Sequence, residues 1–113
     1  MNHHRRHENG VTVLELEGPL DVSQAYEFRD LLGALVDGPS ARLLIDLDRV
    51  TLIDSSGVGV LVTGHRRAAE AEARMVLARP GGSVGRVFEM TRTDRLLRIF
   101  PSVEEGLAAL RDE

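Results

Sequence analysis

From residue 43 onward, short apolar runs alternate with amphipathic segments, and this alternation restricts the possible folds more than any other feature of the chain. Residues 43–45 form an apolar run bounded by turn residues, which is typical of a strand buried on both faces of a parallel sheet. Residues 75–78 and 96–100 are further short apolar runs, and helical spacing of apolar residues follows each of the three. Right-handed crossovers place such helices on the faces of the sheet, so the pattern predicts an α/β domain.

Polar residues that start helices mark the same segments. Asp54-Ser55-Ser56-Gly57 opens the helix after the first buried strand, and Ser83 is expected to cap the next helix. Ser102 with Glu105 forms a capping box before the last helix.

The residues before position 43 predict a further strand and a first helix. Residues 11–17 read VTVLELE, a β-branched and alternating pattern that predicts a strand with one covered face. Gly18-Pro19 is expected to end this strand, and Leu20 to begin a short second one. Asp21, in a capping-box pattern, or Ser23 is expected to cap the helix that follows. Its apolar face consists of Ala25, Phe28, Leu32, Leu35 and Val36.

Residues 1–9 are polar and basic, which predicts a flexible N-terminal head. His3, His4 and His7 could bind a metal ion there, but a disordered tail is the favoured interpretation. No apolar segment follows the basic residues, as a secretory signal would require, so we expect a cytoplasmic protein. The longest apolar runs are only a few residues, so no membrane-spanning segment is expected.

The composition argues against several classes of function. The chain contains no cysteine, which excludes disulfides, thiolate metal sites and thiol nucleophiles. All 14 basic residues are arginine, so no lysine is available for a P-loop or a Schiff base. The net charge of −4 gives no broad electrostatic attraction to nucleic acid.

An enzyme is not expected, and neither is a cofactor or a metal ion. Ser56 and His65 are too far apart for a catalytic dyad, because nine residues of helix separate them by roughly 13 Å. His65 is expected to be a half-buried packing residue with one satisfied nitrogen. Asp46 is expected to accept a backbone hydrogen bond at a strand end. The run Gly57–Val62 resembles the start of a dinucleotide-binding motif but lacks the third glycine.

The turn at residues 54–59 is the strongest candidate for a functional site. Ser55 or Ser56 is expected to cap the helix, which leaves one hydroxyl free at the surface. Gly57 and Gly59 are expected to let another chain approach closely. A phosphate on the free hydroxyl would add about −1.5 to −2 charges and would repel a partner's carboxylate. Asp21 also lies where a strand passes into a helix, so it is expected to meet this turn at one end of the domain.

These residues resemble a known family. Residues 43–47 and 50–61, with Asp-Ser-Ser-Gly at their centre, resemble the signature of STAS domains, and specifically of anti-sigma factor antagonists. Gly18-Pro19-Leu20-Asp21 and residues 87–107 resemble further parts of the same family. The likeness covers about residues 10–111 and implies a single STAS domain at residues 10–113. The implied fold is a mixed, mostly parallel sheet of four to five strands with about four helices.

The resemblance also implies a function. Such proteins bind an anti-sigma factor, itself a serine kinase of the histidine-kinase-like ATPase fold, and so free a sigma factor for transcription. The kinase phosphorylates the second serine of the motif, here Ser56, and a PP2C-type phosphatase restores activity. The resemblance assigns partner binding to Asp21, Asp54, Ser55, Gly57, Val58 and Gly59.

One departure and two alternatives remain open. The family often has Thr-Gly before the last strand, where this chain has Thr91-Arg92, so a surface change is expected there. The first alternative is a STAS scaffold module of a stressosome-like or lipid-transport assembly, without phosphorylation. The second is an enzyme or nucleotide-binding domain.

Overall fold

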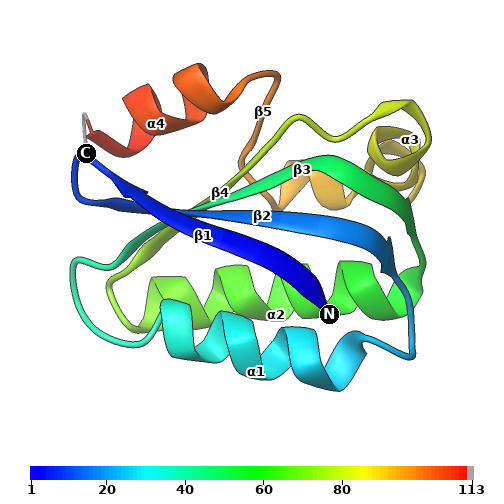
Figure 1. Ribbon diagram of the computed structural model, residues 1–113, viewed down its shortest axis with the longest axis horizontal. Helices are drawn as coiled ribbons and strands as arrows, with labels where there is room; N and C mark the ends of the chain where they lie inside the picture. Colours follow the sequence, from blue (N-terminus) through cyan, green and yellow to red (C-terminus); the bar gives the residue numbers. More distant parts are fainter. Residues whose placement is uncertain (112–113) are drawn as a thin grey trace.

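A sheet of five strands in the order β1-β2-β3-β4-β5 runs through residues 1–111, the part of the chain that this computed structural model describes (Figure 1). β1 pairs with β2 in antiparallel fashion, whereas the remaining neighbours are parallel. The expected mixed, mostly parallel α/β fold is therefore confirmed. The strands are β1 (Asn2–Glu8), β2 (Val11–Leu20), β3 (Arg42–Ile53), β4 (Arg74–Ala78) and β5 (Ile99–Phe100), and the helices are α1 (Ala25–Leu35), α2 (Ser55–Glu70), α3 (Gly82–Met90) and α4 (Val103–Arg111).

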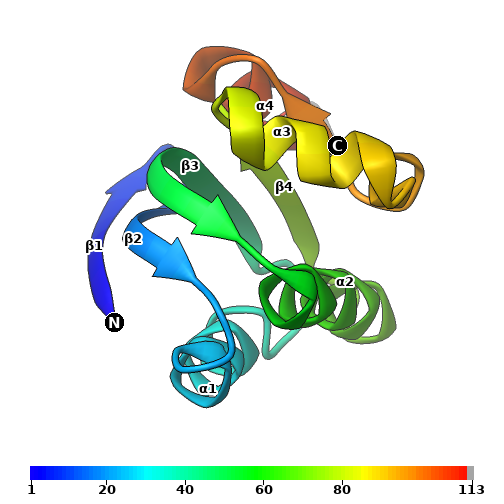
Figure 2. The same ribbon diagram turned by 90° about the vertical axis from the view of Figure 1, so that its right-hand side faces the viewer.

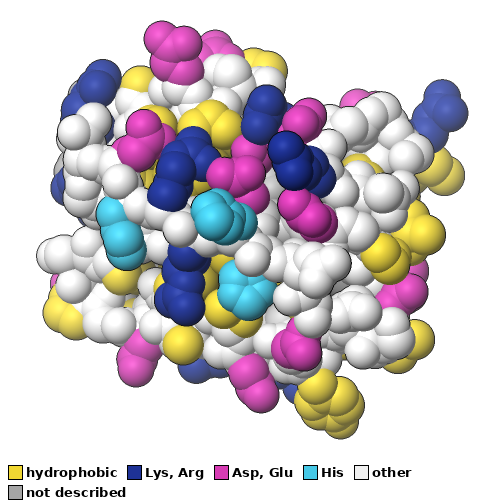
Figure 3. Space-filling model, in the orientation of Figure 1, with side chains coloured by type: hydrophobic (Ala, Val, Ile, Leu, Met, Phe, Trp, Pro, Cys, Tyr) yellow, Lys and Arg dark blue, Asp and Glu magenta, His cyan; other side chains and the backbone are white. Residues whose placement is uncertain are grey.

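The expected flexible head is wrong, because residues 2–8 form the edge strand β1. Asn9 and Gly10 both have positive φ, at 51° and 82°, and they join Glu8 directly to Val11 in a two-residue hairpin. Asn-Gly is the residue pair that such a turn favours. Figure 3 shows the histidines and arginines of β1 gathered on the outer surface of the molecule (Figure 3). Residues 112 and 113 of the expected 10–113 domain lie outside the described residues.

Strand β2 continues through the residues that were expected to break it. The pairing with β3 shifts its register between Glu15 and Glu17 and again between Gly18 and Pro19. Gly18 has φ of 84°, a conformation that favours glycine, and it absorbs one of these irregularities. β2 therefore extends to Leu20, and Asp21 follows it at the carboxyl end of the parallel strands.

The helices lie on both sides of the sheet and enclose two apolar clusters. α1 and α2 lie on one side and α3 and α4 on the other (Figure 2). The larger cluster includes Phe28 and Leu32, which confirms the apolar face expected for the first helix, and Leu61 of α2. Leu110 of α4 belongs to the smaller cluster on the opposite face. This arrangement fixes the start of α2 beside the start of α1.

Of the predicted caps at α1, α3 and α4, only the one at α4 is confirmed. Ser102 Oγ accepts a hydrogen bond from Glu105 N at 3.1 Å, as the capping box requires. α1 instead begins after Gln24, with no side-chain cap, so neither Asp21 nor Ser23 caps it. Ser23 N and Oγ donate to Asp21 Oδ1, which closes a local turn before the helix. Gly81, rather than Ser83, precedes α3.

Arg92 occupies a backbone conformation that suits glycine. Its φ of 60° and ψ of 18° lie in the left-handed region, and it is exposed on the turn after α3. We expect Arg92→Gly to raise the free energy of unfolding by about 0.5–1 kcal/mol, because it removes this strain. Urea unfolding followed by circular dichroism measures the change. Arg95→Gly, in the adjoining 3-10 turn, should lower stability, and equal effects of the two substitutions would contradict the explanation.

Candidate functional site

Asp54, and not a serine, caps the start of α2. Asp54 Oδ1 accepts hydrogen bonds from the backbone N–H groups of Ser56 at 2.9 Å and Gly57 at 3.1 Å. Its extended backbone, with φ of −113° and ψ of −174°, aims the carboxylate back at these two donors. The expectation that Ser55 or Ser56 caps the helix is wrong, because the carboxylate one residue earlier already binds the unpaired N–H groups.

The capping carboxylate leaves both serine side chains available. Within residues 1–111, neither the Ser55 nor the Ser56 hydroxyl forms a hydrogen bond. Ser55 is exposed and Ser56 is half-buried. Both residues line an open groove between the first turns of α1 and α2. Both serines therefore border an open groove, and neither hydroxyl is used by the helix cap.

The two strand ends meet as expected from the sequence. Asp54 N donates to the backbone oxygen of Leu20 at 3.3 Å, and Val22 N donates to Asp54 Oδ2 at 3.2 Å. These bonds join the β2–α1 connection to the β3–α2 connection at the carboxyl edge of the parallel sheet. Asp21 and Asp54 therefore lie at the same end of the domain.

The groove has a volume of about 380 Å³ and an exposed apolar rim. Val22 is 71% exposed and Tyr26 is 79% exposed, which is unusual for residues of their size and places apolar area beside the serines. Arg29 completes this face. Sequence reasoning missed these three residues: Tyr26 and Arg29 lie one turn apart on α1, and Val22 belongs to the turn before that helix.

The glycines and the valine of the motif have different roles. Gly57 is buried, and a Cβ there would overlap the backbone oxygen of Leu20. Val58 is 6% exposed and packs in the core. Gly59 is exposed, and a Cβ there would meet no other atom within 4 Å. Another chain can therefore approach closely at Gly59, as expected. It cannot do so at Gly57, because Leu20 occupies the space beside that residue.

Asp46 and Arg79 form an ion pair away from the groove. Asp46 is 3% exposed, and both of its oxygens accept from Arg79, at 3.1 Å from Nε and 2.7 Å from Nη2. Asp48 N also donates to Asp46, which confirms the expected backbone bond. The hydrogen bond to Asp46 raises the pKa of the Arg79 guanidinium. This pair links β3 to the end of β4 and serves the fold.

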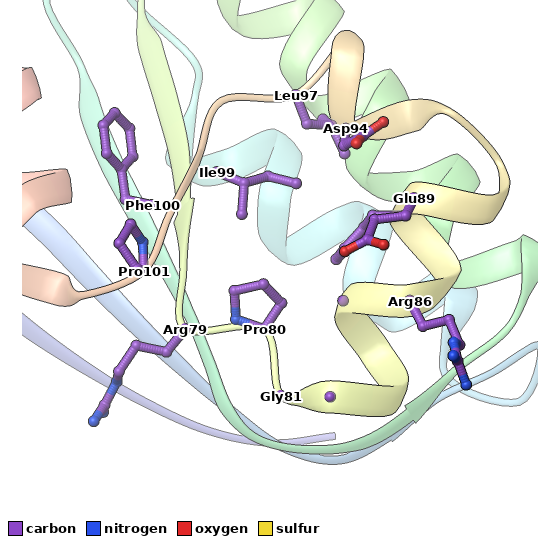
Figure 4. A pocket seen from close by; sticks show the side chains of 13 residues that line it. Arg79, Pro80, Gly81, Arg86, Glu89, Asp94, Leu97, Ile99, Phe100 and Pro101 are labelled. Atoms are coloured by element: carbon purple, nitrogen blue, oxygen red, sulfur yellow. The ribbon is translucent and has the colours of Figure 1, made fainter.

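A larger hollow of about 950 Å³ lies at the carboxyl ends of β4 and β5 (Figure 4). Figure 4 shows Pro80, Ile99 and Pro101 along one wall and Glu89 of α3 opposite. Its rim carries charges of both signs, from Arg86, Glu89 and Asp94 among others. None of the site residues expected from the sequence lines it, so the groove beside Ser56 is the candidate site.

His65 is half-buried with its Nδ1 atom lacking a hydrogen-bond partner, and it does not line the groove that contains Ser56. In the described part of the chain, no group of three or more His, Cys, Asp or Glu side chains is placed to hold a metal ion. Among residues 1–111, no helix has the length and apolar character needed to span a bilayer.

Comparisons with known proteins show the family to which this chain is similar. The family model described as STAS domain matches residues 4–106. The chain is 30% identical to the anti-sigma-F factor antagonist RsfB of Mycobacterium tuberculosis. The alignment spans 104 residues and covers 91% of this chain and 84% of the relative.

Solved structures of two similar proteins share the fold. An anti-sigma factor antagonist from Mycobacterium paratuberculosis has a TM-score of 0.86 at 24% identity, over 98% of this chain and 94% of its own. The anti-sigma factor antagonist SpoIIAA in its unphosphorylated form has a TM-score of 0.77 at 22% identity, over 99% and 98% of the two chains. The phosphorylated form of Bacillus SpoIIAA has a TM-score of 0.68 at 20% identity, over 97% and 100%.

Proposed function

Because this chain belongs to the STAS domain family and its relatives are anti-sigma factor antagonists, we propose that it binds an anti-sigma factor in the bacterial cytoplasm and thereby releases a sigma factor. The proposed partner is a serine kinase of the histidine-kinase-like ATPase fold. It transfers the γ-phosphoryl group of ATP to the oxygen of Ser56, with release of ADP and a proton. A PP2C-type phosphatase reverses the modification by hydrolysis.

The observation that best supports this proposal is that Asp54, and not Ser56, caps the start of α2. Asp54 holds the helix N–H groups, so Ser56 can be modified without loss of the cap. The serine lies in the same groove as the exposed Val22 and Tyr26 side chains, which offer a docking surface. The choice of Ser56 over Ser55 rests on the family resemblance, in which the second serine is modified.

Electrostatics explains how one phosphate would release the partner. A charge of about −2 placed 6 Å from a partner carboxylate is opposed by about 5 kcal/mol at an effective dielectric constant near 20. Even half of this value corresponds to a loss of affinity of more than tenfold. The existence of both an unphosphorylated and a phosphorylated form of SpoIIAA supports a switch of this kind in a protein of the same fold.

The proposal predicts opposite behaviour for two Ser56 variants. Ser56→Ala is expected to bind the kinase within about twofold of wild type and to stay bound when ATP is added. Ser56→Asp is expected to bind about tenfold more weakly, and less weakly than the phosphorylated protein, because one carboxylate carries less charge than a phosphate. Isothermal titration with the copurified kinase measures both affinities, and mass spectrometry locates the phosphate.

Ser55→Ala is the matched control, because it removes the neighbouring hydroxyl from the same groove. This variant should still be phosphorylated and released. A phosphate mapped to Ser55, or switching lost in Ser55→Ala alone, would contradict the assignment to Ser56. Stable binding with no modification of any serine would instead support the scaffold alternative.

A further inference from the structure

The start of α2 offers few groups that can bind a phosphate on Ser56. Backbone N–H groups at a helix start normally bind an anion. Here the N–H groups of Ser56 and Gly57 already donate hydrogen bonds to Asp54. Asp54 places a carboxylate next to the serine, and Asp21 adds a second at the same end of the domain. A phosphate here would therefore lie next to the Asp54 carboxylate, whose cap already uses two of the N–H donors. A cation from another part of the groove would stabilise it.

Arg29 is the arginine that lines the same groove as Ser56. Within residues 1–111 its guanidinium forms no ion pair, and its Cζ atom lies 5.3 Å from the centre of the Tyr26 ring. Helical side chains extend toward the N-terminus of their helix, so Arg29 reaches back along α1 from the next turn. That direction leads toward the end of the groove where Ser56 lies.

We propose that Arg29 is an internal phosphate-binding residue, which leaves the Tyr26 ring and pairs with the phosphate when Ser56 is modified. This inference rests on the proposed function, because that function supplies the phosphate on Ser56. Guanidinium groups bind phosphate oxygens through two parallel hydrogen bonds, which a contact with an aromatic face does not match. The movement also uncovers the Tyr26 ring, so modification changes the shape of the docking surface as well as its charge.

The test uses the full chain with phosphoserine incorporated at position 56 during synthesis, so no kinase is needed. The ³¹P chemical shift, followed against pH, reports the midpoint at which the phosphate gains its second charge. Pairing with Arg29 favours the doubly charged phosphate. The midpoint of the phosphorylated wild type is therefore expected about 0.5 pH units below that of phosphorylated Arg29→Gln. Arg66→Gln is the matched control, because Arg66 is an exposed arginine of α2 that does not line the groove.

A second measurement reads the contact directly. The Nε–H resonance of Arg29 is expected to shift between the unmodified and phosphorylated proteins, while that of Arg66 stays in place. Equal midpoints in the wild type and Arg29→Gln, or an unmoved Arg29 resonance, would overturn the inference. Failure of a kinase to modify Ser56 would instead overturn the proposed function, because the incorporated phosphoserine reports on Arg29 independently of any kinase.

Discussion

Replacing Gly57 with alanine is expected to lower the free energy of unfolding by about 3 kcal/mol, although alanine is the better helix former. The new Cβ would overlap the backbone oxygen of Leu20 and lie 2.8 Å from Ile53 Cγ1. A backbone oxygen in a strand cannot rotate away, so the whole start of α2 must move. That movement stretches the bond from Asp54 N to Leu20, which holds the two connections of the site together.

Gly59→Ala is the matched control, because it makes the same change two residues further along the same helix. A Cβ at Gly59 meets no atom within 4 Å, so this variant should be more stable than wild type by about 0.5–1 kcal/mol. Thermal unfolding should separate the two variants by more than 10 °C for a domain of this size. Equal stability of the two variants would show that Leu20 does not restrict position 57.

Replacing Arg79 with alanine is expected to cost about 2–3 kcal/mol, which is large for a residue whose side chain is 43% exposed. The cost arises at Asp46, which is 3% exposed and, among residues 1–111, would keep only the hydrogen bond from Asp48 N. The substitution removes both hydrogen bonds that the Arg79 guanidinium donates to Asp46. Water replaces these hydrogen bonds only in part, because Asp46 is buried. Urea unfolding at neutral pH measures the loss.

Two variants show whether the unpaired carboxylate is the cause. Asp46→Asn combined with Arg79→Ala removes the buried charge and should recover much of the stability lost in Arg79→Ala alone. Arg49→Ala removes a pair with Glu17 in which both side chains are exposed, and it should cost about 0.5 kcal/mol or less. If Arg79→Ala cost no more than Arg49→Ala, burial of Asp46 would not be the origin of the effect.

The central strands and the meeting of two loops were predictable from the sequence because short-range patterns encode them. The apolar run at residues 43–45 belongs to β3, and the run at residues 75–78 to β4. Parallel strands necessarily end at the same edge of the sheet, so Asp21 and Asp54 were expected to lie together. The hairpin at Asn9-Gly10 carried an equally local signal, which the polar composition of residues 1–9 obscured.

The remaining features depended on choices that the sequence leaves open. Asp54, Ser55 and Ser56 are all good capping residues, and only the extended backbone at Asp54 decides which of them caps α2. The groove depends on the packing of α1 beside α2, so Tyr26 and Arg29 had no visible connection to Ser56. The buried contact of Gly57 with Leu20 likewise arises from the register between β2 and β3.

The order of the strands in the sheet is the order in which the ribosome makes them. Each strand after β1 therefore emerges during translation when one neighbour with which it pairs is already present. β1 and β2 can close their hairpin first, and no later segment has to be inserted between strands that have already joined. A nascent chain stalled after β4 would thus already contain the entire groove beside Ser56, before α3, β5 and α4 have been synthesised.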